Sequence, residues 1–360
     1  MPRPIQAYID LSALENNLQV ARRATSARIM SVIKADGYGH GLLRVAEALA
    51  ATDGFALLDI QEAVQMRQAG FKQAILLLEG FFSLEDLPVI AEHDLTCVIH
   101  SKEQFAMLDA YPGKRTLDVW LKVNTGMNRL GVAPHNVAQM MEQLRRHRAV
   151  REITLMTHFA NADEARGVAE QLKLFNDVAA SYRVARSLAN SAALLRYPET
   201  HGDWVRPGIM LYGASPFAGE SGGEVSAQQL GLRPAMTLTS RIIATQELRS
   251  GEEAGYGAMF RAEQAMRIGI VACGYADGYP RNAVTGTPIL VDGRLTRTLG
   301  RVTMDMLFVD LGALPQSGAG SPVVLWGEGM PVEEVARSAG TVSYELLCAL
   351  SRRVPVNVNG

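Results

Sequence analysis

The sequence predicts an α/β fold in two parts, an N-terminal (β/α)8 barrel of the TIM type followed by a predominantly β domain. In the first two thirds, short β-branched runs alternate with longer segments of helical period, which is typical of parallel α/β folds. After a small, polar stretch at 219–231 the pattern changes to short strands with turn signals. The length of 360 residues also exceeds that of most single domains.

Eight strands are expected in the first part, and the segments between them have the apolar period of helices that cover a closed barrel. The strands are predicted at 29–34, 54–58, 74–78, 96–100, 117–123, 153–157, 184–189 and 204–209. The helices are predicted at 42–51, 60–69, 84–91, 102–110, 136–148 and 164–182. We therefore assign residues 12–228 to the barrel.

Residues 229–360 are assigned to the β domain, and residues 1–11 to a strand that pairs with it. Strands are expected at 236–246, 266–273, 306–311 and 323–326, with short helices at 331–339 and 344–350. The Asp-Gly pair at 292–293 predicts a two-residue hairpin turn.

Composition excludes several classes of function. The chain has 35 basic and 37 acidic residues, a formal net charge of −2, which provides no basic field for nucleic acid or anionic membrane. No apolar run reaches membrane-spanning length, and the first residues lack the apolar core of a signal peptide, so a cytoplasmic location is expected. Cys97, Cys273 and Cys348 are expected to be reduced core residues. The sequence has no metal-ligating motif and no P-loop, so no metal is predicted. Because the charge balance does not favour nucleic acid or membrane, a small-molecule substrate is expected.

Lys34 is the strongest candidate for a chemical centre. It ends an apolar run and precedes a glycine-rich turn, so a buried strand delivers its amine to the barrel rim. Desolvation there lowers the pKa of a lysine and exposes the free amine that forms a Schiff base. The alternative is a strand-end lysine whose stem packs on the rim while its head reaches water.

Other polar side chains are expected at the same rim, because catalytic residues of such barrels gather at the C-terminal ends of the strands. The residues at or just beyond predicted strand ends are Lys34, Arg129, His158, Asn190, Ser191 and Arg206. Their convergence favours a functional site over isolated surface residues.

Seven ordered motifs run through nearly the whole chain. In the predicted barrel they are SVIKADGYGHG at 31–41, LKVNTGMNRLG at 121–131, THFA at 157–160 and WVRPGI at 204–209. In the second domain they are GYG at 255–257, GYADGYP at 274–280 and GRVTMDM at 300–306. With these motifs the chain resembles the alanine racemases, enzymes that use pyridoxal 5′-phosphate (PLP).

The resemblance implies reversible interconversion of L-alanine and D-alanine by two-base proton transfer on a PLP aldimine. Racemisation requires a proton to leave one face of the α-carbon and return on the other, so two bases must flank it. By resemblance Lys34 serves the D-face and Tyr256 the L-face. A phenol loses its proton near pH ~10, so Tyr256 requires a positive or hydrogen-bonding neighbour, which His158 and Arg206 could supply. Alternatively, Tyr256 is an ordinary tyrosine in a glycine-rich hairpin.

The resemblance also implies how PLP and substrate are held. Arg206 would face the pyridine nitrogen and donate to an unprotonated ring, unless it is a solvated or salt-bridged arginine. Arg129 would bind the substrate carboxylate or the PLP phenolic oxygen. Lys122 either carries a carbamate that orients Arg129 or is a plain strand lysine. The remaining cofactor-binding residues are Tyr38, His158, Asn190, Ser191, Gly208, Ile209 and Tyr344.

In the family, the substrate-contacting part of the second domain comes from the partner subunit, so the resemblance implies a homodimer with shared active sites. Tyr275, Met304 and Asp305 match that part. The sequence departs from the usual pattern at Gly37, where alanine is common, and at Thr303, which affects the expected substrate preference. A racemase of another small amino acid such as serine, a non-catalytic PLP-binding protein and a PLP decarboxylase of similar architecture are the alternatives.

Overall fold

The structure is a computed structural model that describes residues 3–113, 115–217 and 225–359. The chain divides into two compact units. The barrel unit comprises Leu18–Gly37 and Gly41–Leu211, and the β unit comprises Met1–Asn17, Tyr38–His40 and Tyr212–Gly360. Part of the predicted boundary at 219–231 lies outside the described residues.

The barrel unit contains a closed barrel of parallel strands, in which β9 returns to pair with β2. Its eight strands are β2 (Arg28–Val32), β3 (Gly54–Leu57), β4 (Ala74–Leu77), β5 (Thr96–Ile99), β6 (Leu117–Lys122), β7 (Val150–Met156), β8 (Ala185–Ser187) and β9 (Trp204–Val205). The predicted barrel and its eight strands are therefore confirmed. Every residue of β3 and of β5 is buried, because side chains fill the barrel on one face and helices cover the other.

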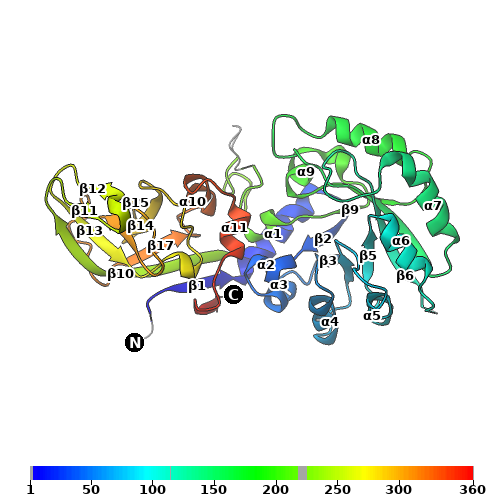
Figure 1. Cartoon of the computed structure of the whole chain (residues 1–360), viewed down its shortest axis with the longest axis horizontal. Coiled ribbons are helices and arrows are strands. Elements are labelled where there is room, and N and C mark those ends of the chain that lie inside the picture. The colour runs from blue at the N-terminus through cyan, green and yellow to red at the C-terminus, as the bar shows by residue number, and fades with distance from the viewer. Residues whose placement is uncertain (1–2, 114, 218–224, 360) are drawn as a thin grey trace. The chain divides into compact units, whose positions relative to one another are not determined.

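Helices follow the strands and lie outside them, as Figure 1 shows for α4 to α7. The helices are α1 (Leu11–Ala24), α3 (Leu42–Ala48), α4 (Ile60–Gln68), α5 (Asp86–Glu92), α6 (Lys102–Asp109), α7 (Val137–Arg146), α8 (Ala169–Ala179) and α9 (Ser191–Arg196). α1 starts in the β unit and ends in the barrel unit. Short 3-10 segments are η1 (Pro134–Asn136), η2 (Pro198–Thr200) and η3 (Ile209–Tyr212).

The β unit is built on an eight-stranded sheet with the order β13-β16-β15-β14-β17-β10-β1-β18. The strands are β1 (Gln6–Asp10), β10 (Met236–Leu248), β13 (Met266–Val271), β14 (Pro288–Val291), β15 (Arg294–Leu299), β16 (Leu307–Asp310), β17 (Pro322–Trp326) and β18 (Val356–Asn359). β1 pairs antiparallel with β10 and parallel with β18. The predominantly β character of this part is confirmed.

Smaller elements complete the β unit. They are the two-stranded hairpin of β11 (Glu253–Ala254) and β12 (Phe260–Arg261), the 3-10 segments η4 (Tyr256–Ala258) and η5 (Tyr275–Asp277), and the helices α10 (Val332–Ser338) and α11 (Ser343–Cys348). The predicted hairpin turn joins β14 to β15, with φ of 49° at Asp292 and 71° at Gly293. Positive φ at both central positions is the geometry that favours Asp-Gly.

One expectation about the cysteines is wrong. Cys97 and Cys273 are buried free thiols, but Cys348, the last residue of α11, is exposed rather than part of the core. In the described part of the chain, no helix is long and apolar enough to cross a membrane. The same residues include no cluster of histidine, cysteine, aspartate and glutamate that could hold a metal ion.

Candidate active site

Lys34 is not part of a strand but begins the short segment α2 (Lys34–Tyr38), which is a left-handed turn. β2 ends at Val32, and the four residues after Lys34 have φ of 55°, 52°, 60° and 52°. Gly37 adopts this conformation without strain, but a left-handed conformation costs roughly 1–2 kcal/mol for each residue with a side chain. The surrounding structure must hold the turn in place, and such strain concentrates at functional sites.

Hydrogen bonds from both sides hold this turn. The Gly37 amide donates to the Ile33 carbonyl at 2.9 Å. The Asp36 carbonyl accepts from the Gly41 amide at 2.8 Å, and its carboxylate Oδ1 accepts from the Leu42 amide at 2.7 Å. Because Leu42 is the first residue of α3, Asp36 satisfies one of the open amides at the start of that helix. The turn is thereby fixed between β2 and α3.

Arg206 follows β9 directly and is buried. Its Nη1 donates to Ser187 Oγ at 2.5 Å, and its Nη2 donates to the carbonyls of Thr157 and Leu188 at 2.6 and 3.2 Å. Burial lowers the pKa of Arg206 to about 10, so the side chain stays charged near neutral pH. All these partners are neutral, and no carboxylate pairs with Arg206 in the part of the chain that the structure describes.

A buried polar network, which no local signal in the sequence indicates, adjoins Arg206 at Thr157. The Thr157 hydroxyl donates to the Val123 carbonyl at 3.0 Å and lies 2.7 Å from the Thr125 hydroxyl. Gln171 of α8 donates to Thr125 Oγ1 at 3.1 Å. These contacts hold the end of β7, where the Thr157 carbonyl accepts from Arg206. A buried network in which every polar group has a hydrogen-bond partner is rigid.

Lys122 is the last residue of β6 and is buried. Burial, followed by the positive charges of Arg206, Arg129 and Lys34, lowers the pKa of Lys122 to about 8. The carboxylate of Glu79, just after β4, opposes this effect. An appreciable fraction of Lys122 is therefore a free amine near neutral pH.

His158 lies beyond the end of β7 and carries a neutral ring. Burial lowers its pKa well below the usual value, and the charges of Arg206, Lys122, Arg129 and Lys34 lower it further. These mutual effects place five predicted residues within electrostatic reach of one another at one end of the barrel. The site is strongly positive, which favours an anionic ligand.

Arg129 is exposed on a loop that Asn124 organises. The side-chain oxygen of Asn124 accepts from the amides of Gly126 and Asn128, each at 3.1 Å. The loop is closed where Val132 donates to the Lys122 carbonyl at 2.8 Å. This ordered loop presents a guanidinium that remains accessible to a ligand.

Two chain segments form a candidate cradle for a phosphate. Asn190 caps α9 by accepting from the Ala193 amide at 3.0 Å, and Ser191 begins that helix. The Gly208 amide donates to Ser191 Oγ at 2.8 Å, and Ile209 begins η3. Val32 donates to the Pro207 carbonyl at 2.9 Å, which brings the 206–209 segment beside the β2 end that carries Lys34. Amides and a hydroxyl suit phosphate oxygens.

The other predicted phosphate-binding residues lie in the β unit. Tyr38 is buried and stacks on Tyr212, with ring centroids 4.4 Å apart. The Tyr344 ring of α11 lies 6.0 Å from the Tyr38 ring. Burial raises the pKa of Tyr38, so its hydroxyl remains a neutral hydrogen-bond donor.

Tyr256 is at the tip of the β11–β12 hairpin and is 73 % exposed. Gly255 and Gly257 on either side have φ of 79° and 71°. A Cβ at residue 255 would lie 3.1 Å from the Phe308 ring, so glycine allows the hairpin to pack there. Within one chain, this phenol projects into solvent.

Tyr275, Met304 and Asp305 lie on two adjacent segments of the β unit. The Tyr275 amide donates to the Thr303 carbonyl and the Ala276 amide to the Met304 carbonyl, both at 3.0 Å. Tyr275 and Met304 are 39 % and 53 % exposed. The structure thus brings these three predicted residues together on one accessible surface.

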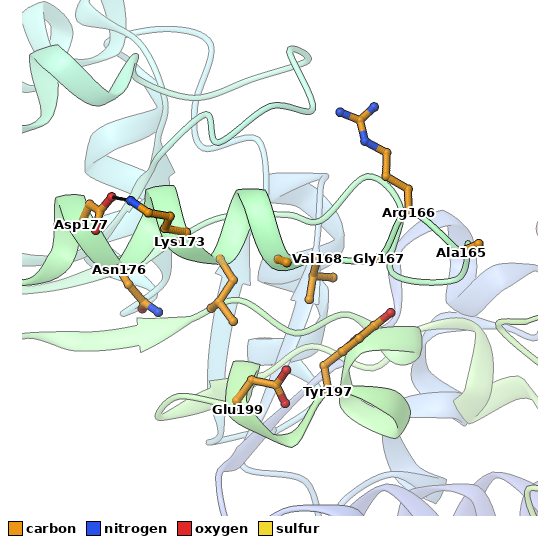
Figure 2. A pocket seen from close by; sticks show the side chains of 11 residues that line it. Ala165, Arg166, Gly167, Val168, Lys173, Asn176, Asp177, Tyr197 and Glu199 are labelled. Carbon is orange, nitrogen blue, oxygen red and sulfur yellow. Dashed lines mark hydrogen bonds and ion pairs between the residues drawn. The ribbon is translucent and has the colours of Figure 1, made fainter.

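A separate pocket lies beside the start of α8 and contains none of the predicted site residues. Figure 2 shows its walls, with Arg166 and Val168 from the loop before α8 and Tyr197 and Glu199 from the region of η2. Lys173 donates to Asp177 at 2.6 Å on its helical side. We assign the functional site to the strand ends rather than to this pocket.

The fold and the strand-end groups define a parallel α/β barrel with a positively charged site at the ends of its strands. Comparison with known proteins agrees with this class. Residues 9–216 match the alanine racemase N-terminal domain family, and residues 235–358 match the alanine racemase C-terminal domain family. The chain belongs to the alanine racemase family of isomerases.

Individual relatives match over the full chain. The alanine racemase of Nitrosospira multiformis is 58 % identical, covering 98 % of this chain and 99 % of the relative. A catabolic alanine racemase of Klebsiella aerogenes is 53 % identical with 99 % of each chain covered. The crystal structure of biosynthetic alanine racemase from Pseudomonas aeruginosa is similar with a TM-score of 0.96 and 45 % identity, covering 99 % of this chain and 100 % of that one.

Proposed function

We propose that this chain interconverts L-alanine and D-alanine with PLP held by Lys34, and that Lys34 and Tyr256 are the two bases. The observation that carries this proposal is the buried Arg206, whose hydrogen-bond partners among the described residues are neutral, at a strand end near Lys122 and the β2 end that precedes Lys34. A guanidinium in that position can donate to a ring nitrogen but cannot take a proton from it.

The residues at the strand ends fit PLP. Lys34 offers a primary amine. The Ser191 hydroxyl accepts from the Gly208 amide and keeps its own proton as a neutral donor to a phosphate. A phosphate bound there would take over the Gly208 amide, with the Ile209 amide next to it in the chain. Asn190 holds the start of α9 in place for Ser191. When bound, PLP withdraws electrons from an attached amino acid and acidifies its α-carbon. In the β unit, the hydroxyls of Tyr38 and Tyr344 are the further phosphate donors that we propose.

The basic residues around Lys34 have separate tasks. Arg129, accessible on its loop, binds the carboxylate of alanine or the phenolic oxygen of the cofactor through its planar pair of donors. Lys122 would orient Arg129 if it carries a carbamate, whose negative charge attracts the guanidinium. The neutral imidazole of His158 accepts or donates a hydrogen bond without adding charge, which allows it to link Arg206 to the phenol that acts as a base.

A homodimer with shared sites would place Tyr256 where it can act. In one chain the Tyr256 side chain is exposed at the tip of its hairpin. A second copy that covers the hairpin would bring Tyr256 beside the positive or hydrogen-bonding neighbours that a phenol needs in order to act as a base. We therefore propose that Tyr256, Tyr275, Met304 and Asp305 of one subunit complete the site of its partner.

The test measures racemisation and cofactor attachment together. Purified protein with PLP should convert either enantiomer of alanine to the racemic mixture. The loss of the circular-dichroism signal of alanine measures this conversion. Borohydride reduction should attach the cofactor to Lys34 in wild-type protein and to no residue in Lys34→Ala. Bound cofactor without racemisation of alanine would favour a PLP-binding protein, and faster turnover of serine than of alanine would favour the other racemase.

A further inference from the structure

A buried carboxylate in the β unit receives two arginines. Asp277 ends η5, two residues after Tyr275, and its side chain is 0 % exposed. Its oxygens accept from Arg3 at 2.8 and 3.2 Å, from Arg353 Nε at 2.7 Å and from the Gly274 amide at 2.9 Å. Burial by itself raises the pKa of Asp277, but these hydrogen bonds prevail and lower it, so the carboxylate is ionised.

Each arginine also contacts residue 305 on the neighbouring segment. Arg3 Nη2 donates to the Asp305 carbonyl at 2.8 Å, and Arg353 Nη2 donates to the Asp305 carboxylate at 2.7 Å. Both guanidinium groups therefore bridge the 274–280 segment, which presents Tyr275, to the 300–306 segment, which presents Met304 and Asp305. We call Arg3, Arg353, Asp277 and Asp305 the arginine clamp.

The fold brings the two arginines together from distant parts of the sequence. Arg3 precedes β1 and Arg353 precedes β18, and these strands pair in parallel with Ala7 opposite Val356. The two bridged segments also approach closely, since a Cβ at Gly274 would lie 2.3 Å from the Thr303 carbonyl oxygen. The arginines therefore tie together the two segments that carry Tyr275 and Met304.

We propose that Asp277 is a positioning residue for substrate binding, because Arg3 and Arg353 clamp it to residue 305 and so fix the segments that present Tyr275, Met304 and Asp305. The inference rests on the proposed function, in which those three residues contact alanine. Asp277 itself takes no part in proton transfer. Loosening the clamp should therefore weaken alanine binding more than it slows turnover.

The test compares arginine variants of the holoenzyme, because the arginine side chains are about two-fifths exposed and their loss leaves the fold intact more readily than loss of Asp277. In Arg353→Met the KM for L-alanine should rise by about tenfold while kcat changes by less than about twofold. Arg353→Lys should show a raised KM as well, because a single ammonium keeps the charge but does not span two segments as a guanidinium does. The matched control is Arg297→Met, which breaks the Arg297–Asp310 pair elsewhere in the same sheet and should leave KM unchanged.

Amide hydrogen exchange gives a second readout that does not need catalysis. Arg353→Met should accelerate exchange in both the 274–280 and 300–306 segments, and Arg297→Met in neither. A wild-type KM in Arg353→Lys would mean that charge alone suffices and would overturn the clamp, as would unchanged exchange in Arg353→Met. If the wild-type enzyme fails to racemise alanine, the proposed function fails, and the exchange result still decides whether the clamp orders the two segments.

Discussion

At the scale of single residues, the site depends on groups whose charge state is set by burial. Arg206 keeps its proton because its pKa, although burial lowers it to about 10, stays well above neutral pH, and Ser187, Thr157 and Leu188 accept its hydrogen bonds without a counter-charge. A carboxylate there would neutralise the guanidinium in a salt bridge. Without a carboxylate partner, the guanidinium keeps a positive charge that can act on the ligand. Burying this unpaired charge lowers the stability of the fold but strengthens the binding of an anion.

Lys122 is expected to carry a carbamate. Its pKa of about 8 leaves free amine near neutral pH, and that amine attacks carbon dioxide, losing a proton as the nitrogen–carbon bond forms. The product is an anion among the charges of Arg206, Arg129 and Lys34. Isotope-labelled bicarbonate should give a carbamate resonance by NMR in wild-type protein and none in Lys122→Met.

The pH dependence of this modification has a definite sign. Protonation removes the reactive amine, so occupancy should fall as the pH drops below about 8 and the ammonium form takes over. Added chloride or acetate should restore activity to Lys122→Met by replacing the missing anion beside Arg129. A labelled resonance that persists in the methionine variant would assign the carbamate to another amine.

At the scale of elements, the left-handed turn after β2 decides where the Lys34 amine points. Its three non-glycine residues in the left-handed region together cost roughly 3–6 kcal/mol at 1–2 kcal/mol each. Contacts with α3 and with β2 must compensate for this cost. The carboxylate of Asp36 is the most specific of them, since it accepts from the first amide of α3 at 2.7 Å.

Replacing Asp36 should therefore loosen both the turn and the lysine. Asp36→Ala removes the acceptor and should lower the free energy of unfolding by about 1 kcal/mol, the usual effect of losing a helix cap. Asp36→Asn is the matched control, because its side-chain oxygen still accepts from Leu42. Thermal unfolding measures the change in stability. The fraction of protein to which borohydride fixes PLP covalently measures how well Lys34 is positioned. Equal behaviour of the two variants would contradict a role for the Asp36 oxygen.

Elements were predictable where the sequence carries a local signal. The Asp-Gly pair at 292–293 correctly predicted the turn between β14 and β15. The apolar period of the barrel segments correctly predicted their strands and helices, although the observed helices are a few residues shorter than the predicted ones. Lys34 was expected to end a strand, yet the strand stops at Val32. The apolar run continues through Ile33, and neither Ala35 nor Tyr38 indicates a left-handed conformation, so the turn depends on tertiary contacts that the sequence does not display.

The residues behind the site were missed for a similar reason. Thr157, Thr125 and Ser187 look like ordinary strand residues, and Gln171 like a polar helix residue. Their hydrogen bonds become apparent only when β6, β7, β8 and α8 are assembled. Asp277 lies within a recognised motif, but its two arginines come from opposite ends of the sequence, so its role depends on the pairing of β1 with β18.

At the scale of the whole molecule, the proposed bases lie in different units. Lys34 belongs to the barrel unit and Tyr256 to the β unit, where its side chain is exposed. A symmetric dimer joins the same pair of surfaces twice, so each site can combine Lys34 of one subunit with the hairpin of the other. This arrangement makes activity a property of the assembly, and it can be tested by mixing inactive variants.

Lys34→Ala and Tyr256→Phe should each be inactive alone and regain activity when mixed under conditions that exchange subunits. In a mixed dimer, one site combines both mutations, while the other contains Lys34 of one subunit and Tyr256 of its partner. Half of the dimers are mixed at equal amounts and each has one intact site, so about one quarter of wild-type activity should return. Differently tagged subunits confirm exchange by co-purification. If exchange is complete and racemisation stays absent, Tyr256 does not act across the subunit boundary, because the intact site would exist in half of the dimers and still fail to move the proton.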